Sequence, residues 1–116
     1  MNRNPALALA ALAVLAPAPA QAEAGRCMVE IDGRRYADGR CTIHKRPDGG
    51  TTLRADGPQR YAVDLEREFA SQARARWSGD ERSRVMNEAE ALGLLTRSGP
   101  DCLVNGRAKV CFWATR

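Results

Sequence analysis

Few residues in this chain have the types and spacing that catalysis requires. The single histidine, His44, stands beside Lys45 and close to no serine or cysteine motif, whereas nucleophilic catalysis needs a base next to the nucleophile. Four aspartates could supply paired carboxylates, but each precedes a glycine, and a place in a tight turn explains that pattern. The four are Asp32, Asp38, Asp48 and Asp56. We therefore expect no enzyme and no cofactor.

Arginine is the residue type best suited to binding a partner. The net charge is +4 at pH 7, and all but two of the basic residues are arginine. Guanidinium groups near an aromatic ring bind anions well. Arg34 and Arg35 follow a turn signal, and Arg76 stands next to Trp77. These three arginines are the candidate binding residues, for an anionic envelope component or an acidic protein surface. An ordinary solvated surface is the alternative, because acidic residues are interleaved throughout.

The first 22 residues have the pattern of a secretory signal peptide. Arg3 is followed by an apolar run from Ala6 to Ala16, by two prolines and by the small residues Ala20-Gln21-Ala22, after which a signal peptidase would cut. The run is too short to span a bilayer, and no second apolar run follows it. We expect one domain over residues 23–116, a periplasmic or secreted location and no transmembrane segment. That location and the lack of a recognition motif exclude nucleic acid as a partner.

All four cysteines lie after the predicted signal peptide. An even number of cysteines in a short exported chain indicates a disulfide framework, with three pairings possible. We expect the local pairs Cys27–Cys41 and Cys102–Cys111, because each pair brackets its own turn signal. A zinc site is the competing interpretation, but the spacing contains no C-x-x-C. We therefore expect no metal.

Each cysteine pair frames a predicted β-hairpin. Residues 27–31 alternate in polarity before Asp32-Gly33, a dipeptide typical of a type I′ turn. Cys41 then needs an offset to reach Cys27, which a bulge at Asp38-Gly39 would provide.

The second pair closes a shorter hairpin. A loop from Asn105 to Ala108 puts Cys102 opposite Cys111 and Leu103 opposite Val110.

The stretch from Tyr61 to Trp77 fits two structures. Its large apolar residues recur every four positions, as on a helix, but residues at both of its ends also alternate as in strands. Folded as a hairpin about Phe69, it would place Asp64 opposite Arg74 and leave Arg76 without an acidic partner. The residues alone leave both interpretations open.

A short helix is predicted from Asp80 to Leu92. Asp80 can cap its N-terminus, Leu92 lies on its apolar face and Gly93 stands where a helix would end.

Three motifs resemble a group of small exported proteins of Gram-negative bacteria to which no function has been assigned. The motifs are Cys-x-Val-x-Ile-Asp-Gly-x-x-Tyr-x-x-Gly-x-Cys at residues 27–41, Leu-Gly-Leu-Leu at 92–95 and Asn-x-x-Ala-Lys-Val-Cys-x-Trp at 105–113. The resemblance implies two strands rather than a helix between residues 61 and 77.

These observations predict one small, mainly β domain. We expect an antiparallel sheet or barrel of short hairpins, stapled by two disulfides and carrying one short α-helix, and we expect a monomer. The predicted function is a non-catalytic binding or structural module of the cell envelope with an arginine-rich face. The alternative is a protein inhibitor of a cell-wall hydrolase such as lysozyme, whose two catalytic carboxylates would attract a basic loop.

Overall fold

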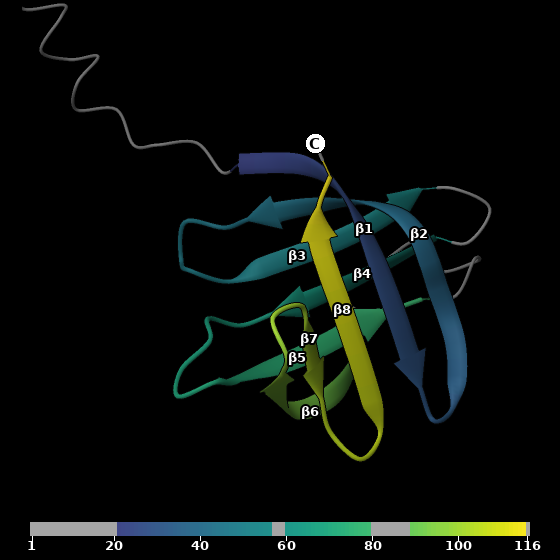
Figure 1. Ribbon diagram of the computed structural model, residues 1–116, viewed down its shortest axis with the longest axis vertical. Helices are drawn as coiled ribbons and strands as arrows, with labels where there is room; N and C mark the ends of the chain where they lie inside the picture. Colours follow the sequence, from purple (N-terminus) through teal and green to yellow (C-terminus); the bar gives the residue numbers. More distant parts are fainter. Residues whose placement is uncertain (1–20, 57–59, 80–88, 116) are drawn as a thin grey trace, which may run out of the picture.

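The computed structural model describes residues 21–56, 60–79 and 89–115, which form a closed eight-stranded barrel (Figure 1). Each strand pairs antiparallel with the next along the chain, and the last pairs with the first. The strands are β1 (Gln21–Ile31), β2 (Arg34–Lys45), β3 (Thr51–Asp56), β4 (Arg60–Leu65), β5 (Gln72–Ser78), β6 (Glu90–Ser98), β7 (Cys102–Val104) and β8 (Ala108–Ala114). The mainly β fold predicted from the sequence is confirmed.

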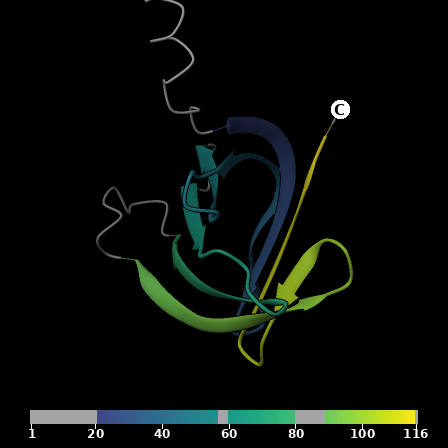
Figure 2. The ribbon, with the colours of Figure 1, turned by 90° about the vertical axis from the view of Figure 1, so that its left-hand side faces the viewer.

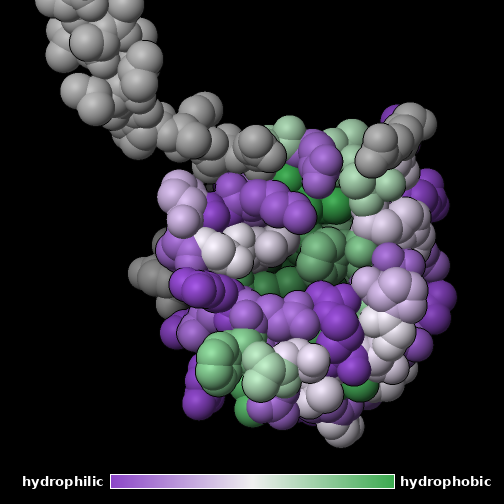
Figure 3. Space-filling model, turned by 60° about the vertical axis from the view of Figure 1, so that its left-hand side comes forward, coloured by the Kyte–Doolittle hydropathy of each residue, from purple (hydrophilic) through white to green (hydrophobic). Residues whose placement is uncertain are grey.

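The strands curve around a hydrophobic core, and Figure 2 shows the course of the strands in a second view. Alternate residues point inward, as the pleat of a strand requires, and most of the buried apolar side chains form a single cluster. Its fully buried large side chains include Val29, Ile43, Leu53, Val63 and Leu95. On the face shown in Figure 3, hydrophilic side chains surround a hollow with a hydrophobic floor.

The first hairpin has the predicted turn but a different bulge. Asp32 and Gly33 both have positive φ, 53° and 81°, as a type I′ turn requires. The extra residue is Tyr36, because Glu30 pairs with Arg35 while Val29 pairs with Ala37. The bulge expected at Asp38-Gly39 is therefore wrong by two positions. The observed bulge at Tyr36 lets the consecutive residues Tyr36 and Ala37 both pack on the core. A bulge at Asp38-Gly39 would leave Tyr36 and Ala37 on opposite faces of the strand.

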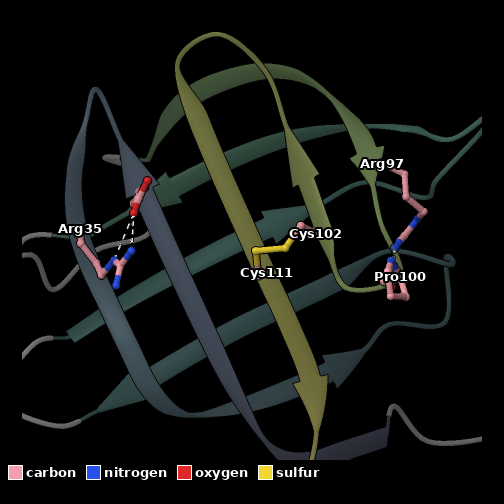
Figure 4. Close-up of a disulfide and its surroundings, with 6 residues drawn as sticks. Arg35, Arg97, Pro100, Cys102 and Cys111 are labelled. Atoms are coloured by element: carbon pink, nitrogen blue, oxygen red, sulfur yellow. Dashed lines mark hydrogen bonds and ion pairs between the residues drawn. A yellow bond between two sulfur atoms is a disulfide. The ribbon is translucent and has the colours of Figure 1, made fainter.

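Both predicted disulfides are present. Cys27 lies opposite Gly39, so its bond to Cys41 runs diagonally between β1 and β2, with Cα atoms 5.8 Å apart. Cys102 lies directly opposite Cys111, as predicted, and their bond joins β7 to β8 with Cα atoms 4.0 Å apart (Figure 4).

Residues 61–77 form a hairpin rather than a helix, but its register differs from the prediction. Its turn is centred on Ala70 and Ser71 instead of Phe69, which pairs with Gln72. The cross-strand partners shift accordingly. Arg76 lies opposite Asp64, whereas the prediction gave that place to Arg74.

The helix predicted over 80–92 is wrong at its C-terminal end. Residues 90–92 belong to β6, while residues 80–88 lie outside the described part of the chain. Leu92 and Leu95 are both buried although they are three positions apart. A bulge beside Gly93, whose φ is 88°, brings both to the inner face. Within the described residues no helix is found, and hence none long and apolar enough to cross a membrane.

Replacing the turn residues Ala70-Ser71 by Asn-Gly should stabilise the protein. Ala70 and Ser71 have φ values of 54° and 64°, where residues other than glycine and asparagine are strained. We expect the free energy of unfolding in urea to rise by about 1 kcal/mol. Gly33→Ala, in the turn of the first hairpin, should instead lower the free energy of unfolding. Gly33 has a positive φ that strains an alanine, and the added Cβ would contact no atom within 4 Å, so backbone strain is the only effect expected. Unchanged stability of the Asn-Gly variant would contradict this view of the turn.

Candidate anion-binding site

A cavity of about 980 Å³ lies where β2 separates from β3. β2 pairs with β1 along its whole length, but it pairs with β3 only from Thr42 to Lys45. Among the described residues, the preceding part of β2 has no strand partner on that side, and it lines the cavity. The lining residues are Ala24, Gly25, Arg26, Ala37, Asp38, Gly39, Arg40, Cys41, Thr42, Arg54, Ala55, Tyr61 and Thr115.

Small side chains on the inner face leave this space unfilled. Gly39 shares a face with its buried cross-strand partner Cys27, and a Cβ added at Gly39 would meet no atom within 4 Å. Ala37 and Ala55 also line the cavity and pack against the core. A barrel of this strand number can hold one small ligand when large side chains do not fill it.

Three exposed arginines belong to the cavity lining, and we call them the arginine rim: Arg26, Arg40 and Arg54. The register places Arg26 directly opposite Arg40. Arg54 lies opposite Thr42, which is two residues beyond Arg40 and therefore on the same face of β2. Within the described part of the chain, no carboxylate forms an ion pair with any of the three. Like charges directly opposite one another destabilise a sheet.

The arginines predicted from the sequence lie elsewhere and have intramolecular contacts. Arg35 donates to Glu30 at 2.7 Å (Figure 4), and it also donates to Asp38 at 3.2 Å. The guanidinium carbon of Arg34 lies 4.8 Å from the centre of the Tyr36 ring. Arg76 donates to the carbonyl oxygen of Ala89 at 3.3 Å. None of the three lines the cavity, so their binding role stays a prediction for a different surface.

Arg34 belongs to a chain of contacts that fastens several strands together. The Tyr36 ring lies 4.6 Å from the Trp77 ring, and the indole of Trp77 donates to Glu90 at 3.2 Å. Arg107 donates to the same carboxylate at 2.7 Å and also to the turn between β1 and β2. The hydrogen bonds from Arg107 and Trp77 hold the pKa of Glu90 below its usual value. This network connects the β1–β2 hairpin with β5, β6 and the loop before β8.

Sequence reasoning missed the arginine rim, although one signal was available. Arg26 and Arg40 each precede a cysteine of the first pair. One extra residue anywhere in the second strand between Arg34 and Arg40 makes these arginines opposite neighbours. Arg54 carried no such signal, because it reaches the site only through the pairing of β2 with β3.

Tyr61 adds a polar group to the wall of the cavity. Its side chain is buried, with 8% exposed, and its hydroxyl has no hydrogen-bond partner. Burial raises the pKa of this hydroxyl to about 12. A buried hydroxyl without a partner is unfavourable for stability and is available to a bound molecule.

Other kinds of site are not evident in the described residues. All four cysteines are in disulfides, and no group of three potential ligands gathers as a metal ion would require in residues 21–56, 60–79 and 89–115. The chain matches no protein-family model, and neither the curated proteins nor the solved structures include a match to it.

Tyr61→Phe should stabilise the free protein at neutral pH. The change removes a buried hydroxyl that has no partner, and we expect the free energy of unfolding to rise by about 1 kcal/mol.

Tyr61→Phe should also change how the stability of the protein depends on alkaline pH. The folded pKa lies near 12 and the ordinary value is 10.0, so the unfolded chain loses this proton first and stability falls between those pH values. The loss in the wild type should approach roughly 2–3 kcal/mol, and Tyr61→Phe should lack it. Phenolate absorbance of the wild type should show one tyrosine that ionises near pH 12, and Tyr61→Phe should lack it. Ionisation of Tyr61 at its ordinary pKa of 10.0 would contradict the burial of its hydroxyl.

Proposed function

We propose that this protein is a non-catalytic binding module of the cell envelope that binds anionic groups at the arginine rim. The observation that carries the proposal is the cross-strand pair of Arg26 and Arg40, both exposed and lacking an ion-pair partner among the described residues. Elsewhere in the described barrel, arginines such as Arg35, Arg97 and Arg107 each contact a carboxylate. An anion bound between Arg26 and Arg40 would replace their repulsion by two attractive contacts.

The chemistry of the guanidinium group supports this assignment. Its planar array of N–H donors matches the oxygens of a carboxylate or phosphate, with two parallel hydrogen bonds from one arginine. The third arginine, Arg54, lines the same cavity and adds positive charge. Among the described lining residues Asp38 is the only acidic one, and Arg35 contacts it at 3.2 Å. The field at the cavity is therefore positive.

The proposed location is the periplasm or the extracellular space. The signal-peptide pattern of residues 1–22 and the resemblance to exported Gram-negative proteins support it. Two disulfides also favour an oxidising compartment. Anionic envelope components are abundant there, and a monomer with one such site would suffice to bind them.

Arg26→Gln and Arg40→Gln should each weaken binding to an anionic envelope component. Titration with lipopolysaccharide or cell-wall fragments should show about a tenfold loss of affinity for each variant. Binding by the wild type should weaken as salt increases. The matched control is Arg74→Gln, an exposed arginine of β5 outside the cavity lining, which should bind normally.

A second readout needs no ligand. Because either glutamine relieves the repulsion between Arg26 and Arg40, both variants should gain a few tenths of a kcal/mol in free energy of unfolding, and Arg74→Gln should not. Normal binding by both Arg26→Gln and Arg40→Gln would refute the proposal.

A second candidate function, inhibition of a cell-wall hydrolase, is favoured by Phe69. This side chain is 83% exposed and stands beside the strained turn of the β4–β5 hairpin. Arg97 holds the turn, since its side chain donates to Glu68 at 2.6 Å and its backbone N–H donates to Ser71 at 2.8 Å. An exposed aromatic side chain on a turn fixed by such contacts is typical of the anchors that fill a partner's pocket.

The mature protein should slow lysozyme if this second candidate is correct, and Phe69→Ala should remove most of the effect. The free energy of unfolding of the Phe69→Ala variant should equal that of the wild type, because the Phe69 side chain is exposed. Leu94→Ala, at a 42% exposed residue of β6, is the control and should inhibit normally. Undiminished lysozyme activity in the presence of the wild type would eliminate this candidate.

A further inference from the structure

We infer that the ligand is an amphipathic anion, with a hydrocarbon chain in the cavity and a carboxylate or phosphate group at the arginine rim. The inference rests on the proposed function and specifies its ligand. It is drawn from three properties of the site: the size of the cavity, the apolar character of its inner wall and the positions of its polar groups.

The cavity is too large for a simple anion. Its volume of about 980 Å³ lies at the upper end of the range for small-molecule pockets. A phosphate or carboxylate held by the arginines would leave most of it unfilled. A ligand that fits the whole site must therefore carry a substantial further part.

The inner wall indicates what that further part is. Ala37, Cys41, Ala55 and the ring of Tyr61 present mainly apolar surface. The Cys27–Cys41 disulfide fixes one side of this wall. These side chains offer few hydrogen bonds to a sugar, whereas they favour contact with a hydrocarbon chain.

The charged groups of the site are exposed, whereas its apolar wall lies inside, and this separation suits an amphipathic molecule. The three arginines are exposed, and the exposed Thr115 also lines the cavity. The hydroxyl of Tyr61, the only buried one without a hydrogen-bond partner in the described residues, lies in the wall. A head group at the exposed arginines would leave the chain to follow the apolar wall inward. This separation distinguishes the site from a flat basic surface for a polyanion.

The test is calorimetric titration of the mature protein with matched probes, each below its micelle-forming concentration. Dodecanoate and dodecyl phosphate carry both parts of the predicted ligand and distinguish a fatty-acid from a lipid-phosphate head group. Acetate and inorganic phosphate carry the charge alone, and dodecanol carries the chain alone. We expect one of the two long-chain anions to bind with one-to-one stoichiometry, at least about tenfold more tightly than the matching small anion and than dodecanol.

Variants separate the chain from the charge. Ala55→Phe fills the cavity and should abolish the gain from the long chain, while Arg40→Gln should reduce affinity for long-chain anions about tenfold. Arg74→Gln should have no effect. Circular dichroism and urea unfolding would check each variant, and Ala55→Val would replace Ala55→Phe if the larger residue prevents folding.

The possible failures are distinguishable. If small and long-chain anions bind equally, with dependence on Arg40 but not on Ala55, the cavity inference is wrong and the proposed function stands. If dodecanol binds as tightly as dodecanoate and Arg40→Gln changes nothing, the proposed function is wrong, and the amphipathic anion with it. Binding of cell-wall fragments, which carry no acyl chain, by the wild type without binding of either long-chain anion would also overturn the cavity inference alone.

Discussion

The arrangement of this barrel depends on one extra residue, Tyr36, in the second strand. Side chains alternate between the two faces of a strand, so one inserted residue reverses the face of every residue beyond it. Without the bulge, Cys41 would face away from Cys27, and Arg40 would point toward the core. With it, the disulfide closes inside the barrel and the two arginines lie opposite each other on its exposed face. Stability and the proposed binding site therefore rest on the same local irregularity.

The same strand both closes the barrel and opens the cavity. β2 pairs with β1 over its full length but with β3 over only four positions. Where it is unpaired on that side, small residues rather than large ones face inward. Space left in a core weakens packing, and the Cys27–Cys41 bond lies beside this space. Closing a loop of this length can contribute roughly 3 kcal/mol in the loop-entropy model. The disulfide can thus offset the weak packing that a ligand cavity requires.

The arginines of the described residues differ in whether they contact a carboxylate. Arg46 donates to Asp48, Thr52 and Asp64, and so ties β2, β3 and β4 together. Arg107 similarly links the β1–β2 turn to the start of β6. The three arginines of the rim make no such contact with a carboxylate in the described part of the chain, although they are the same residue type as Arg46 and Arg107. Composition and net charge cannot separate the two groups, since whether an arginine is paired depends on which strands become neighbours.

The sequence by itself determined the local features: the mainly β class, the type I′ turn at Asp32-Gly33, the opposition of Cys102 to Cys111 and both disulfide pairs. These follow from residues close in the chain, whose turn chemistry and alternation fix their geometry. Only the tertiary structure decided three other features. These are the closure of β1 on β8, the gap between β2 and β3, and the place of Arg54 beside Arg26 and Arg40 in the lining of one cavity. The helix expected up to Leu92 is wrong at its end because Gly93 was interpreted as the residue after a helix. Gly93, with a φ of 88°, instead stands beside a bulge in β6, and a glycine after an apolar residue cannot by itself distinguish the end of a helix from a bulged strand.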